Sequence, residues 1–243
     1  MTASRLTSRR LVRRWTQLIV GLFLYGIGIA FIVRGGLGAA PWDVLTQGIS
    51  HHVPLSFGVI TIVISGVVLL LWIPIRQRPG IGTLLNALCV GPSADIGFQV
   101  IPAADQLWLQ VLFFVLGLVI LAGATGLYIG ADFGPGPRDG LMTGLHRRLG
   151  YPIWAVRTAI EVSVVLVGWL LGGTVGVGTV AFALLVGPLC QFFLRVFAVR
   201  RVGGEDGSTR GAARREAPSA SDAQPSVESV TAVESTDPAG ETR

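Results

Sequence analysis

The residues best placed for chemistry lie in two segments that share one pattern, Gly-x-x-Pro-x-Asp-x-Leu-x-x-Gly. Its proline and aspartate are Pro41 and Asp43 in the first segment, and Pro137 and Asp139 in the second. Proline suits the first helical turn, where a carboxylate meets free N–H groups and the positive end of the helix dipole. The pattern predicts two short helices, interfacial or re-entrant, whose Asp side chains either cap the helix or line a solute path.

A second recurring element is a Gly-Pro dipeptide in the middle of two long apolar runs, Gly91-Pro92 and Gly187-Pro188. Proline has no N–H to donate to the carbonyl four residues earlier, so each dipeptide predicts a break near the middle of its helix. Broken helices at matching places of two halves point to a binding site at the membrane midplane. The alternative is a packing kink that binds nothing.

Other apolar runs contain isolated polar side chains, namely Asn86, Asp95, Arg157 and Glu161. An ionisable group inside a membrane is costly and usually faces the bundle interior or a water-filled cavity. Arg157 and Glu161 lie one turn apart, which predicts an i,i+4 ion pair. Asn86 and Glu161 are candidate specificity groups, and a proton or ion relay through Glu161 or Asp95 is a further alternative.

The elements that position these residues are apolar runs of about 20 residues, the length that spans a bilayer. Half of the chain is hydrophobic (51%), only 14% is charged, and the mean hydropathy is +0.65, which excludes an ordinary soluble domain. Six runs predict six membrane-spanning helices, at about 15–33, 57–75, 80–101, 107–130, 153–171 and 177–199. The first run follows Ser8-Arg9-Arg10, a hint of a twin-arginine signal, but it is longer than a signal sequence needs.

Arginine placement predicts the orientation. Arginines precede the first run and follow the second, fourth and sixth, whereas the alternate connections hold only Arg34. Basic loops stay cytoplasmic, so both termini are expected in the cytoplasm of a bacterial inner membrane.

The chain repeats itself at a shift of 96 residues, the distance from Gly38 to Gly134. At this shift Gly80-Ile-Gly82-Thr83 also falls on Gly176-Val-Gly178-Thr179, and Val90-Gly91-Pro92 falls on Val186-Gly187-Pro188. Each copy has three runs, and an odd number turns the second copy upside down. The sequence therefore predicts an all-α transmembrane protein of two inverted three-span repeats, 15–106 and 107–202, hereafter the first and second halves.

The two ends of the chain differ in charge from the runs between them. A basic cytoplasmic N-terminus is expected at 1–14 and a disordered cytoplasmic tail at 203–243, because the tail is polar and lacks an apolar period. Through Gly203 the chain has 15 Arg and 6 acidic residues (+9), and from Gly204 onward 4 Arg and 8 acidic residues (−4). This distribution argues against nucleic-acid binding, whereas a protein partner bound through the tail and a homo-oligomer both stay open.

The sequence gives no sign of an enzyme, a cofactor or a metal site. Cys89 and Cys190 lie inside apolar runs and have neither metal-ligand nor disulfide spacing. No nucleophile–base arrangement or phosphate-binding loop is present.

Three segments, 36–43, 80–83 and 136–140, resemble motifs of the YczE/YyaS/YitT group of bacterial membrane proteins, most closely its YczE-like branch. The resemblance covers about 15–200 and leaves out the tail. It implies an inner-membrane protein and supplies no catalytic residues, because the group has no established activity.

These patterns together favour a permease for a small solute, with the lipid bilayer and that solute as its partners. The expected site lies between the repeats and is lined by Asp43, Asp139, Pro41, Pro137, Asn86, Gly91, Pro92, Glu161, Gly187 and Pro188. The alternative is a non-transporting membrane regulator or scaffold that acts through a protein partner.

Overall fold

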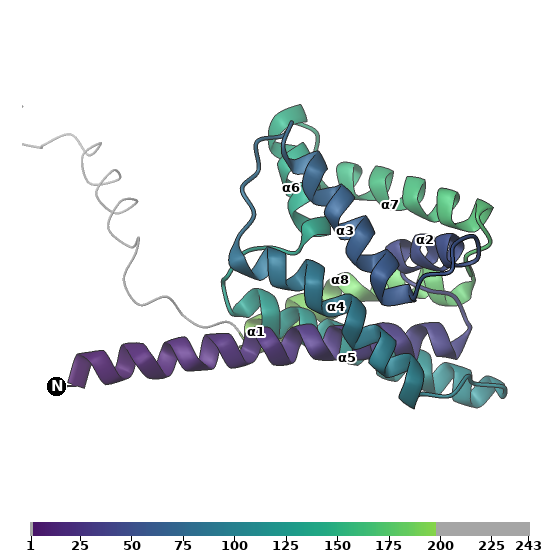
Figure 1. Cartoon of the computed structure of the whole chain (residues 1–243), viewed down its shortest axis with the longest axis horizontal. Helices are drawn as coiled ribbons and strands as arrows, with labels where there is room; N and C mark the ends of the chain where they lie inside the picture. Colours follow the sequence, from purple (N-terminus) through teal and green to yellow (C-terminus); the bar gives the residue numbers. More distant parts are fainter. Residues whose placement is uncertain (1, 198–243) are drawn as a thin grey trace, which may run out of the picture. The chain divides into compact units, whose positions relative to one another are not determined.

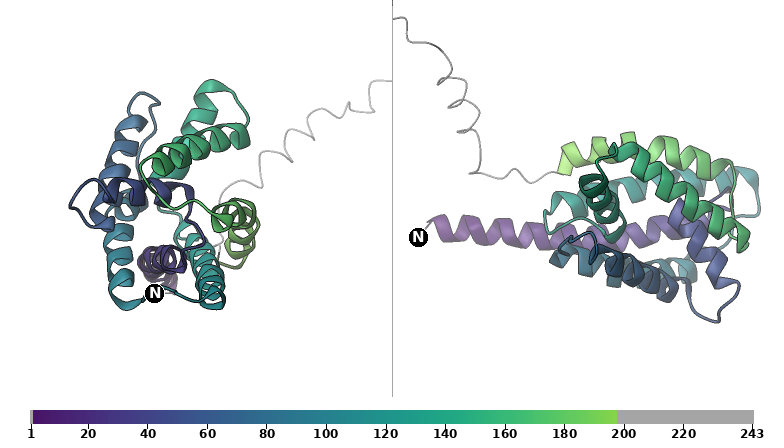
Figure 2. Two further views of the ribbon diagram at one scale, coloured as in Figure 1. Left: turned by 90° about the vertical axis from the view of Figure 1, so that its right-hand side faces the viewer. Right: turned by 90° about the horizontal axis from the view of Figure 1, so that it is seen from above.

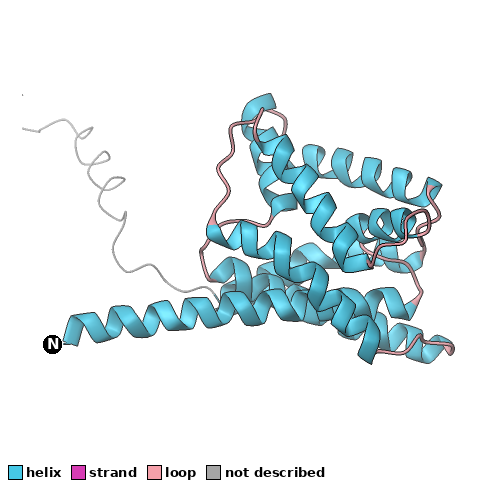
Figure 3. Ribbon diagram, viewed as in Figure 1, coloured by secondary structure: helices cyan, strands magenta, loops and turns pink. Residues whose placement is uncertain are grey.

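The computed structural model describes residues 2–197, with side chains from residue 11 (Figure 1). Every regular element within this range is a helix, as predicted (Figure 3). The helices are α1 (Thr2–Gly35), α2 (Pro41–Ser50), α3 (Phe57–Trp72), α4 (Ile81–Val100), α5 (Leu107–Gly130), α6 (Pro137–Leu149), α7 (Ile153–Leu170) and α8 (Val177–Phe197). The tail predicted at 203–243 lies outside the described residues.

Five of the helices, α1, α4, α5, α7 and α8, are long and apolar enough to cross a membrane. The helix predicted at 57–75 is shorter than expected, because α3 has only 16 residues. It ends at Trp72, two residues before Pro74, which has no N–H with which to continue the helical hydrogen bonds. At 1.5 Å per residue α3 is about 24 Å long, less than the roughly 30 Å of a bilayer core.

The two short helices expected from the recurring segments are present. Pro41 opens α2 and Pro137 opens α6, and each helix has its aspartate in the first turn. Neither carboxylate accepts a hydrogen bond from a backbone N–H among the described residues. The helix-capping interpretation of Asp43 and Asp139 therefore gains no support from the structure.

The breaks predicted at Gly91-Pro92 and Gly187-Pro188 are wrong. Helices α4 and α8 continue through Pro92 and Pro188 without interruption. A proline removes one helical hydrogen bond and adds a local clash, but neighbouring helices can hold the turn in place. Both dipeptides are interior helix positions rather than helix ends.

Glycines allow the first helices of the two halves, α1 and α5, to approach closely along their length (Figures 1 and 2). A Cβ on Gly28 would lie 3.1 Å from the Gly117 oxygen, and one on Gly117 would lie 2.8 Å from the Gly28 oxygen. Earlier in α1, Gly21 faces Tyr128, so the residue numbers fall along α5 as they rise along α1. The two helices are therefore antiparallel, and their small residues permit tight packing.

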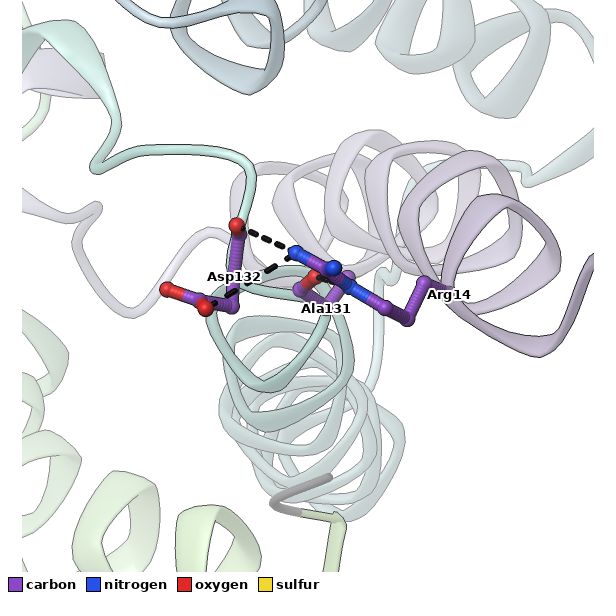
Figure 4. Close-up of polar contacts among 3 residues, drawn as sticks. All are labelled: Arg14, Ala131 and Asp132. Atoms are coloured by element: carbon purple, nitrogen blue, oxygen red, sulfur yellow. Dashed lines mark hydrogen bonds and ion pairs between the residues drawn. The ribbon is translucent and has the colours of Figure 1, made fainter. Parts of the chain in front are cut away.

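Arg14 links the start of this pair to the end of α5 (Figure 4). Its guanidinium donates hydrogen bonds of 2.7 Å to the carbonyl oxygens of Ala131 and Asp132, and its Nη2 lies 3.7 Å from the Asp132 carboxylate. Arg14 thus satisfies carbonyl groups that the end of α5 leaves without helical partners.

Each connection before a short helix packs on the third long helix of the other half. The Gly82 N–H donates to the Phe133 oxygen at 2.9 Å, and the Gly178 N–H donates to the Leu37 oxygen at 2.8 Å. These two hydrogen bonds join residues related by the same shift of 96. Gly38, with a φ of +120°, is needed because a side chain there would be strained and would crowd the start of α8.

The short helices also contact the other half. Helix α2 packs against α7, and α6 packs against α3. The Trp72 indole donates a 3.1 Å hydrogen bond to the Pro137 oxygen, and its ring lies against Gly140. The N-terminus of each short helix is thereby fixed between long helices of both halves, which positions its Asp side chain.

Candidate functional site

A cavity of about 300 Å³ lies among the helices and is lined by both halves. Many of its lining residues come in pairs that are 96 residues apart in the chain. These pairs are Tyr25 and Leu121, Ala40 and Gly136, Pro41 and Pro137, Trp42 and Arg138, Thr61 and Arg157, Ser65 and Glu161, Asn86 and Phe182, and Val90 and Val186. Equivalent surfaces of the two halves therefore face one another across this space.

The two halves contribute different chemistry to the cavity. The first half supplies small polar groups, including Thr61, Ser65 and Asn86. The charged side chains that line it come from the second half, among them Arg157 and Glu161. A solute in the cavity would therefore meet neutral hydrogen-bonding groups on one side and ionisable groups on the other.

The predicted site residues fall into two groups. Those that line the cavity are Pro41, Pro137, Asp139, Asn86, Glu161 and Gly187. Those that do not line it are Asp43, Gly91, Pro92 and Pro188. Gly91 instead packs against Gly58, where a Cβ would overlap the Gly58 carbonyl oxygen.

Asp139 reaches the cavity from the first turn of α6. Tyr128 of α5 donates a 2.9 Å hydrogen bond to its Oδ2. Within the described part of the chain, no arginine or histidine nitrogen lies within ion-pairing distance of the Asp139 carboxylate. Asp139 is thus a carboxylate with a neutral donor at one oxygen and no cationic partner.

Asp43 lies behind the cavity wall, where its side chain is 1% exposed. Arg138 Nη1 is 3.7 Å from Asp43 Oδ1, an ion pair longer than a hydrogen bond, and its guanidinium lies over the Trp42 ring at 5.2 Å from the centroid. Burial raises the pKa of Asp43 to about 6, and the positive charge of Arg138 opposes that rise. The pair joins α2 of the first half to α6 of the second.

Arg157 and Glu161 form the predicted ion pair on α7, with Arg157 Nε 2.9 Å from Glu161 Oε1. The pair is only partly buried, with side-chain exposures of 47% and 20%. It lies where the cavity meets a second, larger space.

This second space is a groove of about 710 Å³ between α7 and α8, which we call the α7–α8 groove. It shares Pro41, Arg157 and Glu161 with the cavity, so the two spaces adjoin at these residues. Its remaining lining is mostly apolar, with Trp154, Val162, Val165, Leu166, Trp169, Val175, Val180, Ala183 and Leu184. The groove therefore lies beside the cavity, between two helices that are long and apolar enough to span a bilayer.

Several residues of the site were not among the predicted ones. Tyr25 and Tyr128 line the cavity with an edge-on ring contact, their centroids 6.0 Å apart. Trp42 and Arg138 stand directly before the two predicted aspartates and occupy equivalent repeat positions. At this position of the repeat the first half has an aromatic residue and the second half has an arginine. This difference could have been read from the sequence.

Asp95 does not line the cavity and instead holds the start of α3. It accepts hydrogen bonds from the Ser56 hydroxyl at 2.6 Å and the Gly58 N–H at 2.8 Å, at the start of α3. A relay through Asp95 therefore has no support from its position. Between residues 11 and 197, no cluster of three His, Cys, Asp or Glu side chains could hold a metal ion.

Comparison with known proteins places the chain among bacterial membrane proteins. It is 40% identical over 181 residues to an uncharacterized protein of Haemophilus influenzae, an alignment that covers 74% of this chain and 83% of the relative. It is 31% identical over 188 residues to the uncharacterized membrane protein YczE of Bacillus subtilis, covering 76% and 87%. YyaS of the same species is 25% identical over 181 residues, covering 73% and 90%.

These matches confirm the resemblance inferred from the sequence motifs. No solved structure matches the chain. The sequence model of one family, described as a family of unknown function (DUF6198), matches residues 12–195. The chain therefore belongs to the DUF6198 family and is a YczE-like membrane protein.

Proposed function

We propose that this membrane protein is a permease for a small solute and not an enzyme, with its site in the cavity between the two halves. The observation that carries the proposal is the pairing of lining residues at a shift of 96. Inverted repeats that share a central site are a known transporter architecture, because rocking one repeat against the other exposes the site to alternate sides.

The proposal includes an inverted six-span topology in the inner membrane, with both termini in the cytoplasm. The antiparallel contact of α1 and α5 supports inversion, since these are the first helices of the two halves. The alternating arginine-rich loops support the orientation. Helix α3 serves as the sixth span, because a bilayer can thin locally around a helix a few ångströms too short.

Ionisable groups in the cavity favour transport over a purely structural role. Asp139, Arg138, Arg157 and Glu161 all line a space between helices of both halves, most of which are apolar. Such groups are costly inside a membrane and mark substrate or ion pathways when they face a cavity. A scaffold that acted only through its ends would gain nothing from them.

The test begins with the purified protein in lipid nanodiscs and a panel of amines, amino acids, organic acids, sugars and inorganic ions. A solute that binds the native state raises the melting temperature. Each stabilising solute is then offered as a radiolabelled tracer to proteoliposomes. Transport predicts uptake that Asp139→Asn abolishes and Asp105→Asn preserves, because Asp105 lies in an exposed loop outside the cavity.

The alternative, a regulator acting through a protein partner, has the charge contrast between the arginine-rich N-terminus and the acidic tail in its favour. Deleting Gly204–Arg243 separates the two functions. A permease keeps its solute uptake without these residues, whereas a tail-dependent regulator loses its cellular effect. A stabilising solute that never crosses the proteoliposome membrane would contradict transport and favour the regulator.

A further inference from the structure

The charge of the cavity narrows the chemistry of its ligand. Arg157 is neutralised by Glu161 at 2.9 Å, and Arg138 is paired with Asp43 at 3.7 Å. Asp139 is left as the lining carboxylate that no cation approaches within the described residues. A single excess negative charge in an apolar surrounding is best balanced by a ligand with one positive charge.

The neutral groups around Asp139 suit the same ligand. The rings of Tyr25 and Tyr128 line the cavity, and Tyr128 donates a hydrogen bond to Asp139. Aromatic faces attract organic cations, and the attraction strengthens where water is excluded. An anion would instead meet the Asp139 carboxylate, and both lining guanidinium groups are already paired with carboxylates.

The lining of the α7–α8 groove indicates that the ligand also has an apolar part. Beyond the Arg157–Glu161 pair, the groove is lined mostly by aliphatic and tryptophan side chains, such as Val162, Leu166 and Leu184. It joins the cavity at Pro41 and at that pair. An apolar surface therefore adjoins the cavity, and an apolar chain attached to a charge at Asp139 would reach it past the Arg157–Glu161 pair.

We infer that the ligand is an amphipathic organic cation, with its charged end at Asp139 and its apolar tail in the α7–α8 groove. The inference rests on the proposed function only in treating this ligand as the transported solute. The open side of the groove lies between two apolar helices, so the ligand enters from the bilayer rather than from bulk water.

The experiment compares ligands of matched size on the full-length protein in nanodiscs, with binding followed by tryptophan fluorescence. The probes are tetramethylammonium, alkyltrimethylammonium ions of four to ten carbons, and alkyl sulfates of the same lengths. Empty nanodiscs give the partition of each probe into lipid. The alkylammonium ions are expected to bind, with affinity rising about three- to fourfold per methylene until the groove is filled. The alkyl sulfates are expected to bind no better than to empty nanodiscs.

Two variants test the two ends of the site. Asp139→Asn is expected to weaken alkylammonium binding by about tenfold or more, because it removes the charge that the cation meets, while Asp105→Asn leaves it unchanged. Ala183→Trp, which fills the groove, is expected to abolish the dependence on chain length and to preserve tetramethylammonium binding. The melting temperature of each variant shows whether it is folded.

Three results would overturn the inference. The first is equal binding of sulfates and ammonium ions by the wild-type protein, which needs no variant. The second is unchanged binding in a folded Asp139→Asn protein. The third is an Ala183→Trp protein whose oligomeric mass changes while its ligand affinity does not. That result would mean that a second copy of the chain occupies the groove. Binding without uptake would refute transport alone, and uptake of an anion would refute this inference alone.

Discussion

The two halves of the molecule share one order of helices but differ where the second long helix meets the third. In the first half α3 packs tightly on α4, with Gly58 against Gly91 and with Asp95 holding the start of α3 through two hydrogen bonds. In the second half α7 and α8 border the α7–α8 groove instead. Figure 2 shows α7 and α8 apart in its left view.

The difference follows from substitutions at equivalent positions. Ser56, Gly58 and Asp95 are replaced in the second half by Pro152, Trp154 and Gln191. Proline and tryptophan cannot supply the hydroxyl donor or the close backbone approach, and Trp154 is 69% exposed. The contact of Gly58, Gly91 and Asp95, which we call the brace, thus holds α3 on α4, whereas the second half has the α7–α8 groove beside its charged residues.

Breaking the closed contact should have the largest effect. Gly91→Leu places a side chain where even a Cβ overlaps the Gly58 oxygen, so we expect it to cost about 3 kcal/mol or more of stability. Its matched control is Gly187→Leu, since a Cβ on Gly187 meets nothing within 4 Å. The melting temperatures of both variants in nanodiscs measure the effect. Equal losses at the two positions would show that the halves do not differ in packing as described.

Removing the Asp95 carboxylate from the brace should have the second largest effect on stability. Asp95→Ala removes the acceptor of the Ser56 and Gly58 hydrogen bonds, and we expect a loss of about 2 kcal/mol, the usual range for bonds to a charged group. Gln191→Ala, at the equivalent position, should change the melting temperature little. A loss at Gln191 as large as at Asp95 would contradict the asymmetry.

Introducing the brace residues into the second half should bring α7 and α8 closer together, with a smaller effect on stability than the two changes above. The triple variant Pro152→Ser, Trp154→Gly and Gln191→Asp gives the second half the contact residues of the first. We expect α7 to move toward α8, and the distance between spin labels at positions 158 and 183 to shorten in a cysteine-free background. Trp154→Gly alone, which lacks the new carboxylate and hydroxyl, should shorten it less. An unchanged distance would show that other contacts hold α7 away, such as its packing on α2.

Much of this architecture could be predicted, because it depends on local rules. Apolar runs placed the long helices, and Pro41 and Pro137 placed the starts of α2 and α6. The predicted breaks at the Gly-Pro dipeptides failed because a helix can continue past a proline at the cost of one hydrogen bond. In α4 the packing of Gly91 on Gly58 also holds this turn in place. The repeat placed Asp43 and Asp139 at equivalent positions without showing that only Asp139 lines the cavity.

The remaining contacts of the site could not be predicted from spacing. The Arg138–Asp43 and Tyr128–Asp139 pairs depend on the angles and distances at which α2, α5 and α6 pack. Periodicity within one helix gives the face of a side chain but not its partner on another helix. The i,i+4 pair of Arg157 and Glu161 was predictable for the opposite reason, because one helix fixes both ends.

The buried aspartate that joins the halves should make the stability of the protein depend on pH. The folded protein raises the pKa of Asp43 from 3.8 to about 6, so the native state holds this proton more tightly than the unfolded chain. The contribution of Asp43 to stability therefore falls as pH rises from about 4 to about 6 and then levels off. Asp43→Asn should remove this pH dependence, seen as the wild-type melting temperature minus that of the variant at each pH. The difference cancels titration of the histidines, which both proteins share. If it instead grew more favourable to the wild type with rising pH, the Arg138 ion pair would outweigh the cost of burying the Asp43 charge.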